Sequence, residues 1–173
     1  MLIIFTGNGK GKTTAALGQA IRAVGSGKRV LMVQFIKGPW ISGEHNSAKS
    51  LDPDLKIVRR GLGFVGICGD NLPIEHHEFA AKQALVYARR EALTRRWNMI
   101  ILDEIWNALK LGLITCKEID ETIQKITPSV EDIITTGRDC PTKFINRADL
   151  VTEMKEIRHP FNAGIMARKG VEF

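Results

Sequence analysis

The sequence is poor in cysteine. It has three cysteines in 173 residues, and Cys68, Cys116 and Cys140 are far apart, with no C-x-x-C pair among them. An odd number of scattered cysteines argues against a disulfide framework and predicts reduced thiols, as in a cytoplasmic protein.

Long apolar runs, repeats and low-complexity segments are also lacking. No stretch approaches the roughly 18 apolar residues of a membrane span, so we expect no membrane segment. The N-terminus has no basic leader followed by a long apolar region, which predicts no secretory signal. Hydrophobic residues make up 44% of the chain. This length and composition predict one globular domain covering residues 1–173.

Aromatic residues are scarce at 6%, although the chain is basic, with a net charge of +6. The densest basic clusters are Arg59-Arg60, Arg89-Arg90 and Arg95-Arg96. Two of these pairs fall on one predicted helix, where a solvated charged face is expected. No aromatic residues interleave with them as a single-strand stacking platform requires. We therefore predict no nucleic-acid partner; the positive charge suits a polyanionic nucleotide equally well.

Apolar runs and helical patterns alternate along the chain. Strands are expected at residues 2–5, 30–35, 55–58, 99–102, 133–136 and 150–157. A helix should follow the first strand. A long helix should cover residues 75–96, with Phe79, Leu85, Ala88 and Ala92 facing inward. A further helix should run from a capping box at Thr115 to about Pro128. This alternation predicts an α/β fold with a mainly parallel sheet flanked by helices.

The most informative segment is residues 6–14, Thr-Gly-Asn-Gly-Lys-Gly-Lys-Thr-Thr, between the first strand and its helix. Strand, glycine-rich loop and helix in this order predict a P-loop, whose backbone N–H groups and helix N-terminus hold phosphates. Lys12 supplies an ammonium group and Thr13 a hydroxyl suited to Mg²⁺. The usual pattern G-x-x-x-x-G-K-[ST] has a glycine where this chain has Thr6. We predict a nucleoside triphosphate site on a P-loop NTPase (RecA-like) architecture.

A second motif is the apolar strand 99–102 followed by Asp103 and Glu104. About 90 residues after a P-loop, a carboxylate pair at a strand end predicts metal ligands beside the phosphates. One carboxylate should hold Mg²⁺ directly or through water, and the other could orient water or a substrate.

Two other patterns are weaker. Residues 61–66 match G-x-G-x-x-G, but no helix start follows them, so a loop is favoured over a dinucleotide site. His76 and His77 are neighbours on the predicted long helix and point in different directions, so they cannot converge on one metal ion. They are interpreted as part of a solvated helix start.

Several segments together resemble the P-loop corrinoid adenosyltransferases over essentially the whole chain. They are residues 7–14, including the Thr6 departure, 34–38 with 42–44, Gly63-Phe64, 102–104, Thr136-Gly137-Arg138 and the tail 159–173. The resemblance implies transfer of the 5′-deoxyadenosyl group of ATP to the cobalt(I) of a reduced corrinoid, with release of triphosphate.

The resemblance also implies the site residues. The triphosphate loop would comprise Gly7, Asn8, Gly9, Lys10, Gly11, Lys12, Thr13 and Thr14, with Arg138 as a further phosphate contact. Thr13 and Glu104 would bind Mg²⁺ or Mn²⁺, with Asp103 as the other candidate ligand. Lys12, Glu104 and Phe64 would be the catalytic residues, and Phe64 would lie against the lower face of the corrin ring.

The chain departs from many relatives at two points. They carry a tryptophan two residues after the phenylalanine, where this chain has Gly66, and an N-terminal helical extension before the first strand. The resemblance further makes a flavoprotein a candidate electron donor and a homodimer the expected assembly.

Two other functions remain open from the residues alone. One is a P-loop phosphotransferase or NTPase, which would release ADP. The other is an ATP-dependent corrinoid carrier without turnover. The products discriminate among the three: triphosphate, ADP or none.

Overall fold

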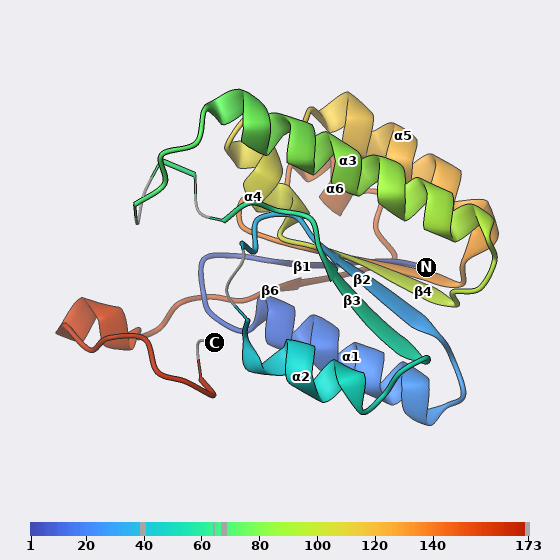
Figure 1. Cartoon of the computed structure of the whole chain (residues 1–173), viewed down its shortest axis with the longest axis horizontal. Helices are drawn as coiled ribbons and strands as arrows, with labels where there is room; N and C mark the ends of the chain where they lie inside the picture. The colour runs from blue at the N-terminus through green and yellow to red at the C-terminus, as the bar shows by residue number, and fades with distance from the viewer. Residues whose placement is uncertain (39–40, 64, 67–68, 172–173) are drawn as a thin grey trace.

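A six-stranded, entirely parallel sheet forms the centre of the protein in a computed structural model (Figure 1), which describes residues 1–38, 41–63, 65–66 and 69–171. The strand order is β3-β2-β4-β5-β1-β6. The strands are β1 (Leu2–Thr6), β2 (Val30–Gln34), β3 (Leu55–Arg59), β4 (Met99–Asp103), β5 (Asp132–Thr136) and β6 (Leu150–Glu153). The predicted α/β class with a parallel sheet is confirmed.

The central strands explain why the apolar runs were informative. Every residue of β2 and β4 is buried, as expected for parallel strands covered on both faces. The edge strand β6 is exposed along its length and ends at Glu153, so the prediction of a strand to residue 157 was too long. Beyond Glu153 the backbone leaves the sheet edge and passes the P-loop instead.

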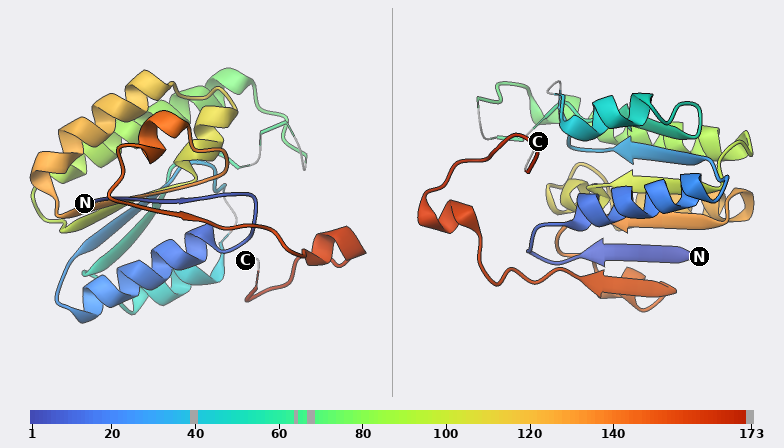
Figure 2. Two further views of the ribbon diagram at one scale, coloured as in Figure 1. Left: turned by 180° about the vertical axis from the view of Figure 1, so that it is seen from behind. Right: turned by 90° about the horizontal axis from the view of Figure 1, so that it is seen from below.

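Helices cover both faces of the sheet (Figures 1 and 2). One face carries α1 (Lys12–Gly25) and α2 (Gly43–Lys49). The other carries α3 (Ile74–Leu93), α4 (Ile105–Lys110), α5 (Cys116–Ile126) and α6 (Thr142–Ile145). Short 3₁₀ turns occupy Thr127–Ser129 and Pro160–Ala163. Two separate apolar clusters result, one on each side of the sheet.

Helix α3 lies where the sequence predicts it but ends at Leu93, three residues early. Leu85, Ala88 and Ala92 are buried as expected, whereas Phe79 is 67% exposed, so its inward placement was wrong. His77 belongs to the buried face of α3. Phe79 lies two positions further along the helix and therefore points away from that face. The capping box that opens α5 is confirmed, since the Thr115 hydroxyl and the Glu118 carboxylate bond each other's backbone N–H.

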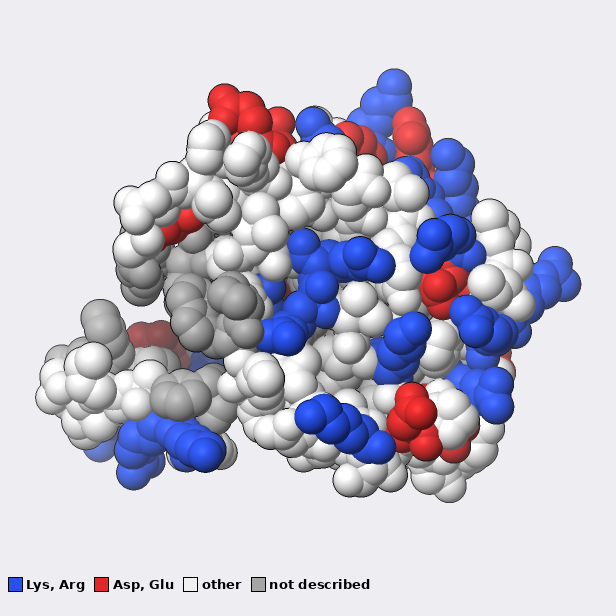
Figure 3. Space-filling model, viewed as in Figure 1, with Lys and Arg blue, Asp and Glu red and all other residues white. Residues whose placement is uncertain are grey.

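The C-terminal tail, residues 154–171, extends past the carboxyl ends of the strands and returns toward the β1–α1 loop (Figures 1 and 2). Cys116 and Cys140 are free thiols, and Cys68 lies outside the described residues. None of the described helices is long and apolar enough to cross a membrane. On the face seen in Figure 3, basic side chains form several separate groups, some beside acidic ones.

Candidate active site

The loop between β1 and α1 curls tightly because two of its glycines adopt left-handed backbone angles. Gly7 has φ 96° and Gly11, which precedes the first turn of α1, has φ 113°. Residues with a Cβ rarely adopt these angles. Thr6, which stands where the usual pattern has glycine, accepts a hydrogen bond on its hydroxyl from the Cys140 N–H at 3.2 Å. It thereby ties the loop to the segment after β5.

Gly9 is required because another segment of the chain passes close to it. A Cβ on Gly9 would lie 2.8 Å from the Met154 carbonyl oxygen and 2.8 Å from the Lys155 carbonyl carbon. The Gly9 N–H donates to that Met154 oxygen at 2.7 Å, so it is directed at the neighbouring chain segment rather than inward at an anion. The glycine at this position permits the segment after β6 to pack against the loop.

Lys12, the first residue of α1, reaches back over the loop. Its ammonium donates to the carbonyl oxygens of Gly7 at 2.7 Å and Gly9 at 2.6 Å. Burial, together with the nearby Arg138 charge, lowers the pKa of Lys12 from its ordinary value. The ammonium is therefore held where phosphates would approach the loop and the N-terminus of α1.

Thr13 and the first carboxylate of the Asp103-Glu104 pair are in direct contact. The Thr13 hydroxyl donates to Asp103 Oδ1 at 2.9 Å, and the Thr136 hydroxyl at the end of β5 donates to the same oxygen at 2.7 Å. Asp103 is fully buried, which raises the pKa of its carboxyl, while these donated hydrogen bonds oppose the rise. Strand β4 thus brings Asp103, 90 residues from Thr13 along the chain, to the loop, and β5 adds the still more distant Thr136.

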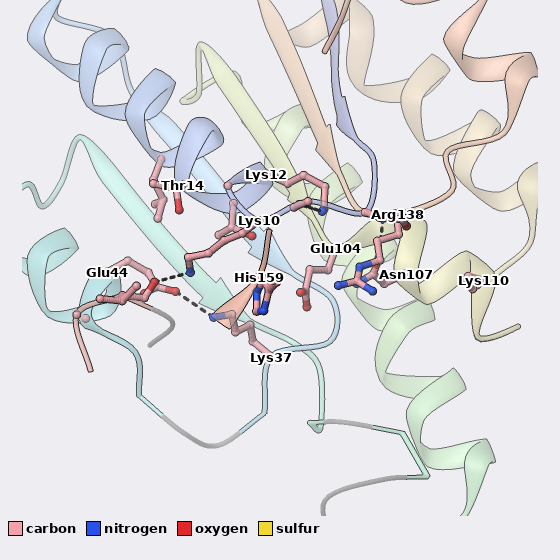
Figure 4. Close-up of a pocket in the computed structure, with 18 of the residues that line it drawn as sticks. Lys10, Lys12, Thr14, Lys37, Glu44, Glu104, Asn107, Lys110, Arg138 and His159 are labelled. Carbon is pink, nitrogen blue, oxygen red and sulfur yellow. Dashed lines mark hydrogen bonds and ion pairs between the residues drawn. The ribbon is translucent and has the colours of Figure 1, made fainter. Parts of the chain in front are cut away.

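Glu104 follows β4 in a left-handed backbone conformation with φ 62°. Such a conformation is uncommon for a non-glycine residue and occurs often at functional sites. The Glu104 N–H donates to the Thr136 hydroxyl at 2.8 Å, which holds this geometry. Its carboxylate points into a cavity (Figure 4), where burial and the adjacent Asp103 raise its pKa to about 7.

The cavity has a volume of about 890 Å³ and opens at the carboxyl edge of the sheet. Most of the predicted site residues line it: residues 8–14, Glu104 and Arg138. Gly7 and Asp103 do not line it but contact lining residues, as described above. Phe64, the expected corrin contact, lies outside the described residues.

Sequence reasoning assigned no site role to several lining residues, among them Lys37, Glu44, Asn107, Lys110 and His159. Lys37 and Glu44 form an ion pair at 3.4 Å, and the Asn107 side chain accepts a hydrogen bond from the Arg138 N–H at 2.8 Å (Figure 4). The position of Lys37 three residues after a buried strand was the available signal. Glu44 and His159 fall in segments 42–44 and 159–173, which carry the family resemblance, but for Asn107 and Lys110 on α4 the sequence offered no signal.

The loop after β3 begins and ends at defined anchors. A Cβ on Gly61 would lie 2.3 Å from the Phe35 carbonyl oxygen, so the loop starts in close contact with the end of β2. At the other end, Asp70 accepts hydrogen bonds from the N–H groups of Gly66 at 2.9 Å and Leu72 at 3.1 Å. His77 Nε2 lies 3.1 Å from the same carboxylate and is only 3% exposed. The interpretation of His77 as part of a solvated helix start was therefore wrong.

Comparison with known proteins agrees with these features. The family model for the ATP:corrinoid adenosyltransferase BtuR/CobO/CobP matches residues 1–173. The corrinoid adenosyltransferase of Escherichia coli K12 is 34% identical over all of this chain and 85% of its own length. CobA of Salmonella typhimurium is 33% identical with the same coverage, and the Pseudomonas aeruginosa enzyme is 35% identical over all of this chain and 83% of its own.

A solved structure also resembles this fold. The flagellar accessory protein FlaH from Methanocaldococcus jannaschii superposes with a TM-score of 0.59 at 14% identity, covering 88% of this chain and 69% of that one. At this identity the likeness concerns the fold alone. The match of the family model over the whole chain, with three relatives above 30% identity, shows that this chain belongs to the BtuR/CobO/CobP family of ATP:corrinoid adenosyltransferases.

Proposed function

We propose that this protein transfers the 5′-deoxyadenosyl group of ATP to the cobalt of a reduced corrinoid. Cobalt(I) supplies the electron pair for a new bond to the ribose C5′. The C5′–O bond breaks, and its electrons leave with the oxygen of inorganic triphosphate. The observation that carries the proposal is the cavity in which the loop, Lys12, Glu104 and Arg138 converge, in a chain of this family.

The residues around the cavity suit a polyphosphate leaving group. Lys12 and Arg138 supply positive charge, and the first N–H groups of α1 are directed at the cavity edge because a helix cannot satisfy them internally. We assign to these groups the stabilisation of negative charge that grows on the leaving oxygen. Preorganised donors of this kind each contribute about 2.7–4 kcal/mol in well-studied acyl-transfer sites.

The donor set also fits Mg²⁺ or Mn²⁺. Because the Thr13 hydroxyl donates its hydrogen bond to Asp103, its oxygen lone pairs remain available for a cation. Among the described residues no donor reaches the Glu104 oxygens, and no cluster of three or more His, Cys, Asp or Glu side chains is present. A hydroxyl and one free carboxylate leave several positions for water and phosphate, which is how Mg²⁺ usually binds. We assign Thr13 and Glu104 as direct ligands, with Asp103 holding Thr13; the metal would neutralise phosphate charge.

The corrinoid half of the site rests on the family resemblance. The loop of residues 61–73 leaves the sheet beside the end of β2 and is anchored at Asp70. We assign Phe64, within this loop, to the lower face of the corrin ring, where an apolar wall keeps axial ligands from cobalt. A cobalt(II) centre without its lower ligand is easier to reduce.

Three broader assignments accompany the activity. We propose a flavoprotein as the electron donor, a homodimer as the assembly and the cytoplasm as the location. Free thiols at Cys116 and Cys140 are consistent with a reducing compartment. Reduction assays with purified flavoproteins and the molar mass in solution test the first two.

The decisive experiment measures products. The protein is incubated with ATP, Mg²⁺, a corrinoid and a strong reductant, while the visible spectrum and the released phosphates are followed. Triphosphate should appear in step with the adenosylated corrinoid, and Glu104→Ala should weaken the metal dependence. Steady release of ADP without corrinoid would instead indicate an ordinary NTPase.

A further inference from the structure

The buried side chain of Gln34 lies beside Asp103 and has no role in the proposed mechanism. Gln34 is the last residue of β2 and has no exposed surface. In the parallel register of β2 and β4 it lies directly opposite Asp103. Its Nε2 donates to Asp103 Oδ2 at 3.1 Å, the oxygen that Thr13 and Thr136 leave unused.

The other end of the Gln34 amide contacts helix α2. Gln34 Oε1 lies 2.8 Å from Nε2 of His45, the third residue of that helix. On the far side of the imidazole, Nδ1 lies 3.3 Å from the Ser42 backbone nitrogen and 3.1 Å from the Ser42 hydroxyl. A continuous polar chain therefore runs from the start of α2 to the P-loop threonine.

The hydrogen-bond partners at its two ends restrict the orientation of the Gln34 amide. Since the Asp103 carboxylate accepts, Gln34 must present its NH₂ group to it and its oxygen to His45. His45 Nε2 must then carry a proton, whereas Nδ1 can accept from the Ser42 N–H at 3.3 Å or donate to the Ser42 carbonyl oxygen at 3.2 Å. With the Gln34 amide turned over, its oxygen would face a buried carboxylate, which is costly for both groups. Asp103 at one end and His45 at the other thus hold the Gln34 amide in one orientation.

We propose that Gln34 and His45 are positioning residues for the metal and triphosphate site. His45 orients Gln34, Gln34 fixes the Asp103 carboxylate in the plane where Oδ1 accepts from Thr13, and Thr13 directs its lone pairs at the cation. This inference rests on the proposed function for the identity of the cation site. Groups that orient metal ligands from behind commonly change metal affinity 10–100-fold when they are removed.

Two substitutions at one position separate the roles of the two imidazole nitrogens. In His45→Gln the side-chain amide nitrogen can occupy the place of Nε2, and in His45→Asn it can reach only the place of Nδ1. We expect Mn²⁺ binding in the presence of ATP, measured by electron paramagnetic resonance, to be near normal in His45→Gln and about 10-fold weaker in His45→Asn. Gln34→Leu should weaken it at least as much. Asn46→Ala is the control, because Asn46 is exposed and its side chain accepts from Lys49 on the surface of α2.

A second measurement needs neither substitution nor ligand. The ¹⁵N shifts of His45 in the unaltered protein should show a proton on Nε2. An Nε2 without a proton, Mn²⁺ affinity in His45→Asn equal to that of the unaltered protein, or no binding of Mn²⁺ with ATP at all would overturn the inference. If Mn²⁺ binding depends on His45 as expected but no triphosphate forms with corrinoid, the proposed function fails while the positioning role stands.

Discussion

Replacing Glu104 by glutamine should stabilise the protein strongly at pH 8 and only slightly at pH 5. Burial and the neighbouring Asp103 raise the pKa of Glu104 to about 7, against the opposing charges of Lys37, Lys12 and Arg138. A carboxyl group whose pKa is raised by folding contributes its full stability below its ordinary pKa. That contribution is lost as the pH rises through the folded value.

The size of the effect follows from the two pKa values. Each pH unit between the ordinary 4.5 and about 7 corresponds to about 1.4 kcal/mol, so ionised Glu104 costs the folded state about 3 kcal/mol at pH 8. Glutamine keeps the shape of the side chain and carries no charge. It also removes the repulsion that Asp103 experiences, which acts in the same direction. The same substitution should weaken Mg²⁺ binding, because the amide is a poorer ligand for Mg²⁺ than a carboxylate.

The assay is urea unfolding of both proteins at pH 5, 6, 7 and 8, without metal or nucleotide. The difference in free energy of unfolding should grow from under about 1 kcal/mol at pH 5 to about 3 kcal/mol at pH 8 in favour of Glu104→Gln. Glu78→Gln is the matched control, because Glu78 is more exposed and pairs with Lys82 on the surface of α3. A difference that does not change with pH, or a less stable variant at pH 8, would refute the reasoning.

The remaining predictions concern the two halves of the site. Lys12→Ala should cost about 2–4 kcal/mol of transition-state stabilisation, measured as a fall in kcat/KM. Turnover within about threefold of the unaltered enzyme would show that Lys12 is not a catalytic group. Asp70→Ala deletes the acceptor shared by Gly66, Leu72 and His77; it should raise KM for the corrinoid while KM for ATP stays constant, and equal changes in both would argue against a local effect. Phe64→Ala should lose most activity when cobalt(II) and a mild protein reductant are supplied and keep more when cobalt(I) is supplied directly. Equal losses in both assays would contradict a role in cobalt reduction.

Features that depend on neighbours in the chain could be predicted from the sequence. The continuously apolar strands, the P-loop between β1 and α1 and the capping box at Thr115 all lie where local patterns indicate. Parallel strands also align their carboxyl ends, so the approach of Asp103 to the loop followed once the fold class was known. The family resemblance rested on the same ordered motifs.

Only the tertiary structure decided which of these groups meet, and in what orientation. Gly9 directs its N–H to Met154, and Phe79 faces solvent although its helix was predicted. His77 is buried against Asp70, and Gln34 connects His45 to Asp103. Local pattern gives the type of an element and its apolar face, but hydrogen bonds between distant segments depend on how the elements pack. Burial then makes every unpaired polar group costly, which is why packing selects one set of partners for these side chains.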